Sequence, residues 1–194
     1  MRKSSCVLIL SLICVFFYPL EAAPFRPVPW LTDGAVRFLE EFFQKHDEPS
    51  VLEFGSGSSS VWFAKRTKNL TSIEHDKDCH DLVKSKIRAM SNTENVKLIL
   101  KARPYFDVCK QFSTESFDLI LVDGRERVGC IKAAISLLKP GGIMMLDNSE
   151  RPRYRPAFKA LSAWPYFEAK QKGRDQCNFY CKGWKTSWWI KPND

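Results

Sequence analysis

The feature that most constrains the fold is a regular alternation of short apolar segments with segments of helical periodicity. Apolar runs at 50–54, 70–74, 96–101, 117–122 and 143–146 predict buried strands. Apolar residues spaced three or four apart predict helices over 33–45, 59–65, 77–90, 127–138 and 155–163. Strands that alternate with helices in this way indicate a parallel sheet covered by helices on both faces.

The end of the chain departs from this alternation. Two short strands, near 167–170 and 186–190, follow one another without a long helix between them, so we expect an antiparallel final hairpin. The predicted fold class is therefore α/β, with a doubly wound, mostly parallel seven-stranded sheet. In such sheets ligands bind beyond the carboxyl ends of the strands, where the strand order reverses. The loops after Phe54, Glu74, Val122 and Leu146 should therefore meet around one crevice.

The first 22 residues have the layout of a secretory signal peptide. Arg2 and Lys3 precede an uncharged apolar run of 13 residues, 6–18, which is well short of the roughly 20 residues that a membrane-spanning helix needs. Small residues follow at Ala22 and Ala23, and cleavage after Ala22 is the more plausible because Pro24 comes next. We expect a domain over 24–194 in the secretory pathway, either secreted or in the lumen of the endoplasmic reticulum or Golgi. An uncleaved anchor is the alternative, and without it no stable membrane span is expected.

The secretory route gives meaning to two further features. Removal of the signal leaves an odd number of cysteines, so at least one thiol stays unpaired within the chain. These five cysteines are Cys79, Cys109, Cys130, Cys177 and Cys181. Cys177 and Cys181 could form a disulfide bridge if the residues between them make a turn. Asn69 begins an Asn-Leu-Thr sequence, which is an acceptor for N-glycosylation.

The chain carries a formal net charge of +8, and its last quarter is the most basic part. A basic surface attracts anions of any kind, although a secretory route argues against nucleic acid as a partner. The partners that we expect are a small-molecule or glycan acceptor, of which acidic ones would suit the charge. The alternative interpretation is that the charge serves only solubility.

The loop after the first predicted strand contains Gly55 and Gly57, which permit a tight turn and close approach of a ligand to the backbone. A dinucleotide-binding loop would have a third glycine where this chain has Ser60. Glu53 precedes the glycines, where it could meet the ammonium group of an amino-acid ligand and would repel a pyrophosphate. The loop therefore favours a ligand other than a nicotinamide dinucleotide.

Acidic residues also follow three other predicted strands. Glu74 ends the second strand, where it could accept hydrogen bonds from both ribose hydroxyls of a nucleoside, and Asp76 is placed to cap the next helix. Asp123, Asp147 and Asn148 come directly after two buried strands, and their oxygens would suit Mg²⁺ or Ca²⁺. The alternative is that Asp123 binds loop amides while Asp147 and Asn148 form a turn.

The ordered set formed by Glu53, Gly55, Gly57, Glu74, Asp123 and the Leu-Lys-Pro-Gly-Gly sequence at 138–142 resembles class I S-adenosylmethionine-dependent methyltransferases, which have a Rossmann-like fold. The resemblance extends from about residue 30 to 191. It implies S-adenosylmethionine as methyl donor, with Glu53, Gly55, Ser56 and Gly57 around its methionine half. It further implies Glu74 on the ribose and Asp123 beside the donor as the candidate catalytic residue.

Two finer resemblances concern the acceptor. The sequences around 54–59, 73–76 and 122–127 resemble a subgroup that is often associated with polysaccharides. Asp123, Asp147 and Asn148 are similar to the metal ligands of catechol-type O-methyltransferases, in which the cation orients the acceptor hydroxyl. The lysine base of those enzymes corresponds to Glu126 in this chain, which argues against a catechol acceptor.

The expected reaction is transfer of a methyl group to an acceptor oxygen, with Asp123 positioning or deprotonating the hydroxyl. We expect an acidic acceptor, such as a uronate or a sulfated sugar, to be bound by Arg125, Arg127, Arg151 and Arg153. One alternative is a catalytically inactive methyltransferase-like binding module. Another is an NAD(P)-dependent oxidoreductase, which would need a substrate domain for which the chain leaves little room.

Overall fold

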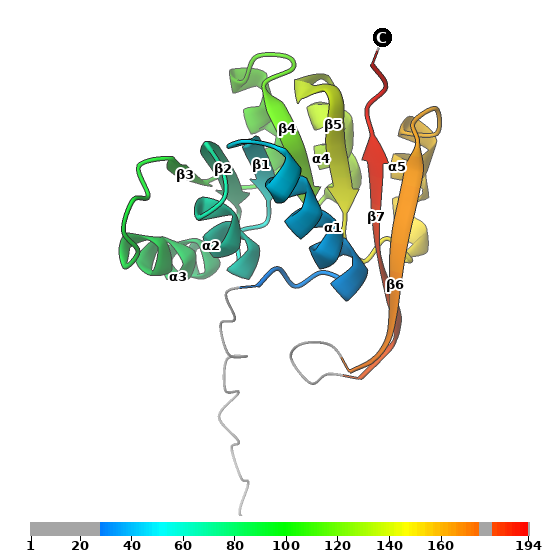
Figure 1. Ribbon diagram of the computed structural model, residues 1–194, viewed down its shortest axis with the longest axis horizontal. Helices are drawn as coiled ribbons and strands as arrows, with labels where there is room; N and C mark the ends of the chain where they lie inside the picture. The colour runs from blue at the N-terminus through cyan, green and yellow to red at the C-terminus, as the bar shows by residue number, and fades with distance from the viewer. Residues whose placement is uncertain (1–27, 175–179, 194) are drawn as a thin grey trace, which may run out of the picture.

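The computed structural model of the chain describes residues 28–174 and 180–193. These residues form a seven-stranded sheet with the strand order β3-β2-β1-β4-β5-β7-β6 (Figure 1). The first five strands of this order are parallel, and β7 runs antiparallel to both β5 and β6. The predicted α/β fold with an antiparallel final hairpin is confirmed. The predicted signal peptide lies outside the described residues.

The strands and helices alternate as the sequence predicts. The strands are β1 (Ser50–Phe54), β2 (Asn69–Glu74), β3 (Val96–Leu100), β4 (Phe117–Val122), β5 (Leu138–Leu146), β6 (Tyr166–Arg174) and β7 (Tyr180–Ile190). The helices are α1 (Asp33–Lys45), α2 (Ser58–Ala64), α3 (Lys77–Arg88), α4 (Arg127–Ala134) and α5 (Arg155–Ala160). Three 3₁₀ helices, η1 (Tyr105–Gln111), η2 (Ile135–Leu137) and η3 (Pro152–Tyr154), connect them.

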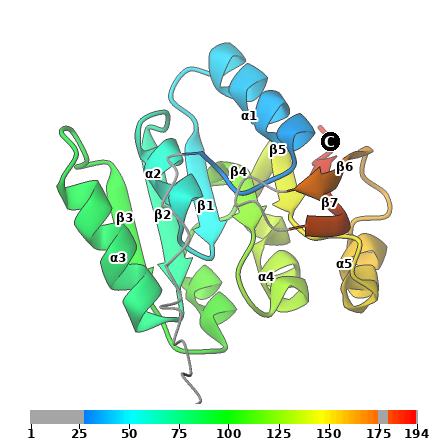
Figure 2. The same cartoon turned by 90° about the horizontal axis from the view of Figure 1, so that it is seen from below.

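Helices cover both faces of the sheet (Figure 2). Because side chains alternate along a strand, Leu52 and Phe54 of β1 face one core cluster, whereas Val51 faces the other. The first cluster includes residues of η1, α4 and α5, and the second includes residues of α1 and α2. Each strand of the centre is therefore buried from both sides, which explains the nearly continuous apolar runs in the sequence.

The strand order reverses between β1 and β4, and this reversal positions the site. The hydrogen-bond ladder of the sheet continues one residue beyond β1, β4 and β5, so the first residue of each following loop is held in place. The backbone N–H groups concerned are those of Gly55 (to Ile73 O, 2.8 Å), Asp123 (to Phe54 O, 2.9 Å) and Asp147 (to Val122 O, 3.3 Å).

The largest differences from the sequence-based expectation are four. Helix α4 ends at Ala134, four residues earlier than expected. Strand β5 begins at Leu138 rather than at residue 143, and its register with β4 shifts between Phe117 and Leu119, because the Lys-Pro-Gly-Gly sequence bulges from the strand. The final hairpin is about twice as long as predicted. Helix α5 ends at Ala160, three residues earlier than expected. Over the described ranges, no helix combines the length and apolar character needed to cross a membrane.

Candidate functional site

The loops after β1, β2 and β4 enclose a cavity of about 290 Å³ at the carboxyl edge of the sheet, which we name the donor cavity. Gly55 and Gly124 form its floor, and they pack directly against each other. Gly55 has a φ of +98°, and a Cβ on it would lie 2.6 Å from the backbone N of Gly124. Glycine is therefore needed at position 55 both for the left-handed backbone and for the close approach of the two loops.

Gly57 serves the cavity in a different way. A Cβ built on Gly57 meets no atom of the described residues within 4 Å, so this glycine leaves open space rather than permitting a tight contact. Gly57 lines the donor cavity together with Ser56, Ser58 and Ser59. The backbone of this loop is thus accessible to a ligand, as the sequence predicted.

Glu53 has a structural role instead of the predicted contact with a ligand. It is fully buried beneath the first turn of α2, and it does not line the donor cavity. Its two carboxylate oxygens accept hydrogen bonds from the hydroxyl groups of Ser59, Ser60 and Ser72, the last two at 2.5 Å. Burial raises the pKa of Glu53 to about 7, although the three hydroxyl groups oppose the rise. Ser60, where a dinucleotide site would have glycine, is needed for this contact.

Glu74 lines the donor cavity at the end of β2, in the position predicted for a ribose contact. Its Oε1 accepts from the backbone N–H groups of His75 (2.7 Å) and Asp76 (2.8 Å), and its Oε2 accepts from that of Ser56 (2.9 Å). Because a carboxylate oxygen has two lone-pair sites, one acceptor position remains on Oε2. Glu74 thus ties the first two loops together and offers one hydrogen bond to a ligand.

Apolar side chains that the sequence did not single out form the mouth of the donor cavity. Trp30, Leu82 and Val83 line it, and Trp30 and Leu82 are 41% and 50% exposed. Apolar side chains that gather at one cavity, rather than being scattered over the surface, are typical of ligand-binding sites. Asp76, as expected, caps α3 by accepting from the N–H groups of Asp78 and Cys79, both at 3.0 Å, and so places Leu82 at the mouth.

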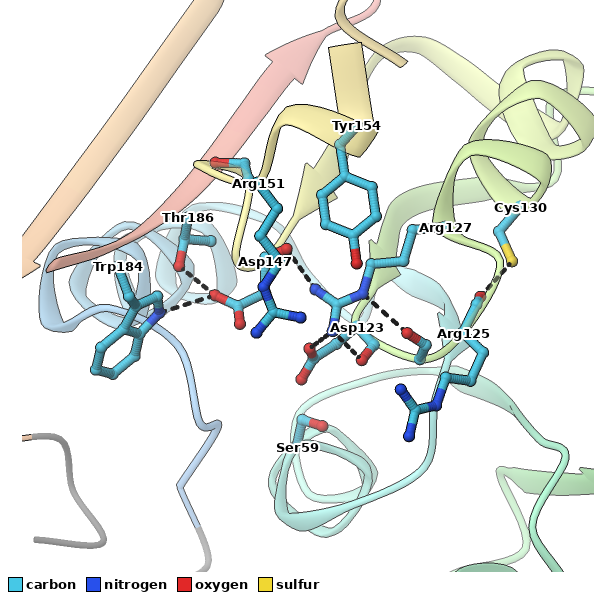
Figure 3. A network of polar contacts seen from close by, with 12 residues as sticks. Ser59, Asp123, Arg125, Arg127, Cys130, Asp147, Arg151, Tyr154, Trp184 and Thr186 are labelled. Carbon is cyan, nitrogen blue, oxygen red and sulfur yellow. Dashed lines mark hydrogen bonds and ion pairs between the residues drawn. The ribbon is translucent and has the colours of Figure 1, made fainter. Parts of the chain in front are cut away.

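The loop after β4 is held by Arg127, which corrects the prediction that Arg127 binds an acceptor. Arg127 is 6% exposed, and its guanidinium donates to three backbone carbonyl groups and to one carboxylate. The acceptors are Gly124 O (2.8 Å), Asp123 O (2.7 Å), Asp123 Oδ1 (2.9 Å) and Asp147 O. A guanidinium so fully engaged is not available to a substrate (Figure 3). It fixes the loops after β4 and β5 relative to each other.

The residues predicted to bind a metal do not fit one. Oδ1 of Asp147 accepts from the hydroxyl of Thr186 (2.7 Å) and from Nε1 of Trp184 (3.1 Å), so it already has two donors. The guanidinium of Arg127 supplies the positive charge beside Asp123 that a cation was expected to supply. Asp147 therefore anchors β7 to β5, and the alternative of satisfied loop carboxylates describes the structure better.

Asp123 keeps a partly free carboxylate in the donor cavity. Its side chain is 28% exposed, and its Oδ1 accepts from Arg127. Burial and the nearby Asp147 carboxylate raise the pKa of Asp123, whereas the guanidinium of Arg127 opposes the rise. A carboxylate with a raised pKa that is oriented by a buried arginine can accept a proton near neutral pH.

A second cavity of about 430 Å³, which we name the arginine cavity, adjoins the first at Gly124. Its lining is formed by the loop before η1, the start of α4 and the segment around η3. The residues are Arg103, Phe106, Gly124, Arg125, Glu126, Arg127, Val128, Gly129, Arg151, Arg153 and Tyr154. In Figure 3, Arg151 and Tyr154 lie near Asp123 and Arg127, whereas Arg125 extends away from them. Arg103 and Tyr154 were not singled out in the sequence.

The other residues predicted from the sequence are Asn148, Asn69 and the cysteines. Asn148 has a φ of +46° in the turn after β5, in keeping with the alternative that Asp147 and Asn148 form a turn. Asn69 is exposed at the start of β2, on the opposite edge of the sheet from both cavities. Within the part of the chain that the structure describes, Cys79, Cys109 and Cys130 form no disulfide bridge. The predicted disulfide bridge involves Cys177, which lies outside the described residues.

Comparison with solved structures supports the fold. An O-methyltransferase from Bacillus cereus, in complex with SAH, superposes with a TM-score of 0.63 at 18% identity, over 83% of this chain and 82% of that one. The O-methyltransferase TomG from Streptomyces achromogenes, in complex with SAM, gives 0.63 at 17%, over 80% and 78%. An rRNA methylase from Streptococcus thermophilus gives 0.61 at 13%, over 81% and 96%. The shared fold does not select an acceptor, since it occurs both in O-methyltransferases and in an rRNA methylase.

Comparison of the sequence identifies the family. No curated protein sequence matches this chain. Residues 52–149, about half of the chain, match the model of a family described as "Methyltransferase domain". The match begins in β1 and ends just after β5, so it includes Gly55, Gly57, Glu74, Asp123 and Arg127. The chain therefore belongs to this methyltransferase-domain family.

Proposed function

We propose that the chain is an S-adenosylmethionine-dependent O-methyltransferase. The observation that carries the proposal is the meeting of two cavities of different character at the Asp123–Gly124 segment. One is lined by glycine-rich backbone, an acid and apolar side chains, and the other by arginines. A group-transfer enzyme needs such an arrangement, because donor and acceptor must approach each other from separate sites.

The donor cavity suits a nucleoside with an amino-acid tail. Glu74 offers the remaining acceptor position of its Oε2 to a ribose hydroxyl, and the exposed rings and chains of Trp30 and Leu82 would cover a base. The open space over Gly57 leaves room for the methionine portion. The solved relatives from B. cereus and S. achromogenes, which were crystallised with SAH and SAM, support this choice of donor.

Asp123 is the residue that we assign to the chemistry. The cosubstrate supplies a methyl group that is bound to a sulfonium. As the new O–CH₃ bond forms and the S–CH₃ bond breaks, the sulfur keeps the electron pair and the hydroxyl proton passes to the Asp123 carboxylate. Arg127 holds this carboxylate through Oδ1 at 2.9 Å and leaves Oδ2 free to face the acceptor. Alignment of the two reactants would supply most of the rate, up to roughly 7–11 kcal/mol.

The site of action that we propose is the secretory pathway, with a small-molecule or glycan acceptor. The support is the signal-like sequence of residues 1–22 and the Asn69 acceptor, which the structure leaves exposed. Expression in eukaryotic cells should give a chain that begins near residue 23 and whose apparent mass falls on endoglycosidase treatment, whereas the apparent mass of Asn69→Gln should not change. A chain that retains residues 1–22 in the soluble cytosolic fraction would refute the route.

The donor is tested by calorimetry with S-adenosylmethionine and S-adenosylhomocysteine. We expect micromolar binding of both, and a tenfold or greater loss for Glu74→Gln, in which an amide would face the backbone N–H groups that Glu74 now binds. Asp81→Asn, the same carboxyl-to-amide change at an exposed residue of α3, is the control. Absence of binding to folded wild-type protein would refute the methyltransferase and favour the inactive binding module.

A further inference from the structure

We propose that the arginine cavity recognises an anionic group of the acceptor, and that Arg103 and Arg125 are the residues that bind it. This inference rests on the proposed function, because it assigns a substrate class to the second cavity of that site. It differs from the sequence-based expectation in its residues. Arg127 is excluded by its burial, and Arg103, which no motif indicated, is included.

The balance of charge in the cavity is the first support. Five arginines line it against one acid, Glu126, and of the five only Arg127 is neutralised within the site, by Asp123. Like charges that gather in a concave site repel one another unless an anion joins them, so such a cluster has a cost in the empty state. Surface arginines normally avoid this cost by pairing with nearby carboxylates.

The pairing of these arginines is the second support. Arg151 lies 3.6 Å from Glu150, and the NH2 group of Arg153 donates to the hydroxyl of Tyr154 at 3.2 Å. By contrast, neither Arg103 nor Arg125 forms an ion pair with any residue that the structure describes, and both side chains are exposed. Two unpaired guanidinium groups on the wall of one cavity provide the planar donor pairs that carboxylate, sulfate and phosphate groups accept.

The start of α4 is the third support. Helix α4 begins at Arg127, and its N-cap residue, Glu126, has a φ of +49° and makes no side-chain cap hydrogen bond. The first turn therefore lacks a side-chain acceptor for its free N–H groups, and its residues Val128 and Gly129 line the cavity. An anion at this place would meet the positive end of the helix as well as the arginines.

The position of the cavity connects this binding to the reaction. The arginine cavity meets the donor cavity at Gly124, next to Asp123. An acceptor held by its anionic group at Arg103 and Arg125 would therefore extend toward Asp123 with its hydroxyl. In this arrangement the arginines bind the anionic group, and Asp123 accepts the proton of the hydroxyl. A neutral molecule with the same hydroxyl would lack the contact that holds it in place.

The test measures anion binding to the chain purified from a secretory host and saturated with S-adenosylhomocysteine, at constant ionic strength. The probes are glucuronic acid, its neutral counterpart glucose, inorganic sulfate and inorganic phosphate. The variant is Arg103→Gln/Arg125→Gln, and the matched control is Arg155→Gln, an exposed arginine on α5 that does not line the cavity. Calorimetry gives the affinity of each probe, and the affinity for S-adenosylhomocysteine is measured for every protein.

We expect at least one anion to bind more tightly than glucose, and its binding to weaken about tenfold or more in the double variant and less than twofold in the control. Preference for glucuronic acid would identify a carboxylate acceptor, and preference for sulfate or phosphate a tetrahedral anion. The inference is overturned if no anion binds more tightly than glucose, or if Arg155→Gln weakens binding as much as the double variant. Retained affinity for S-adenosylhomocysteine in those cases would leave the proposed function standing.

Discussion

The buried carboxyl group of Glu53 makes a quantitative prediction for the variant Glu53→Gln. Glu53 sits beneath α2 with no exposed surface, and its pKa is raised from 4.5 to about 7. A carboxyl group with a raised pKa in the folded state binds its proton more tightly there than in the unfolded state. Its contribution to stability is therefore fully present below pH 4.5 and is lost as the pH rises to about 7.

The magnitude follows from the size of the pKa change. At about 1.4 kcal/mol for each pH unit, the rise corresponds to about 3 kcal/mol. Glutamine has nearly the same shape and is neutral at every pH, and the hydroxyl groups of Ser59, Ser60 and Ser72 can both donate to and accept from its amide. The free energy of unfolding of Glu53→Gln should therefore stay level where that of the wild type falls.

Urea unfolding of both proteins between about pH 5 and pH 8 checks this prediction. The difference in unfolding free energy should move by about 3 kcal/mol in favour of the variant, which for a domain of this size is a relative shift in Tm of about 6–12 °C. Glu41→Gln, an exposed carboxyl-to-amide change on α1, should show no such pH dependence. A difference that stays constant with pH would mean that the folded state ionises Glu53 like an exposed glutamate. A difference of opposite sign would mean that the three hydroxyl groups outweigh burial.

Three further predictions concern the loops. Gly57→Ala should change the unfolding free energy by less than about 0.5 kcal/mol, because its Cβ meets no atom within 4 Å, yet weaken S-adenosylmethionine binding at least tenfold by calorimetry; unchanged affinity would place the donor elsewhere. Asp123→Asn should reduce turnover far more than donor affinity. It should also remove the rise in rate that is expected as the pH passes the raised pKa of Asp123. Equal losses of turnover and of donor affinity would make Asp123 structural. Arg127→Gln should lower the unfolding free energy by about 2–4 kcal/mol in urea titrations, while Arg155→Gln leaves it unchanged; a loss no larger than that of the control would contradict the buried role of Arg127.

The fold could be predicted from the sequence because its signals are local. Apolar runs buried on both faces, helical spacing and the glycines at the strand ends each depend on a few neighbouring residues. The carboxyl-edge position of Glu74 and Asp123 followed from the topology alone, since all parallel strands end at the same edge. The lengthened β5 and the long hairpin escaped prediction because the bulge at 139–142 and the pairing of β6 with β7 depend on tertiary contacts.

The roles within the site were harder to predict, because residue type does not reveal which partner a side chain finds. Glu53 and Glu74 are both acids at the carboxyl ends of neighbouring strands, yet Glu53 is buried under three hydroxyl groups and Glu74 lines the donor cavity. Arg127 and Arg125 are two positions apart, yet Arg127, the first residue of α4, is buried, whereas Arg125, in the loop before α4, is exposed. Arg103 lies far from any motif and reaches the site only through the path of the chain after β3.

The distribution of charge across the site argues for the proposed pair of substrates. A sulfonium donor is a cation, and the donor cavity presents Glu74 and Asp123; the arginine cavity presents Arg103 and Arg125, which suit an anion. Methyl transfer with passage of the hydroxyl proton to Asp123 neutralises the sulfonium and the Asp123 carboxylate, so a site that is poorer in water than bulk solvent favours the transition state over the charged reactants. The charge of each cavity therefore disfavours binding of the other cavity's ligand, whatever the shape of that ligand. A neutral acceptor would lack the contact with the arginines and would be aligned with the donor less well. The chain should therefore have a lower kcat/KM for a neutral acceptor than for an anionic one, even when the reactive hydroxyl is identical.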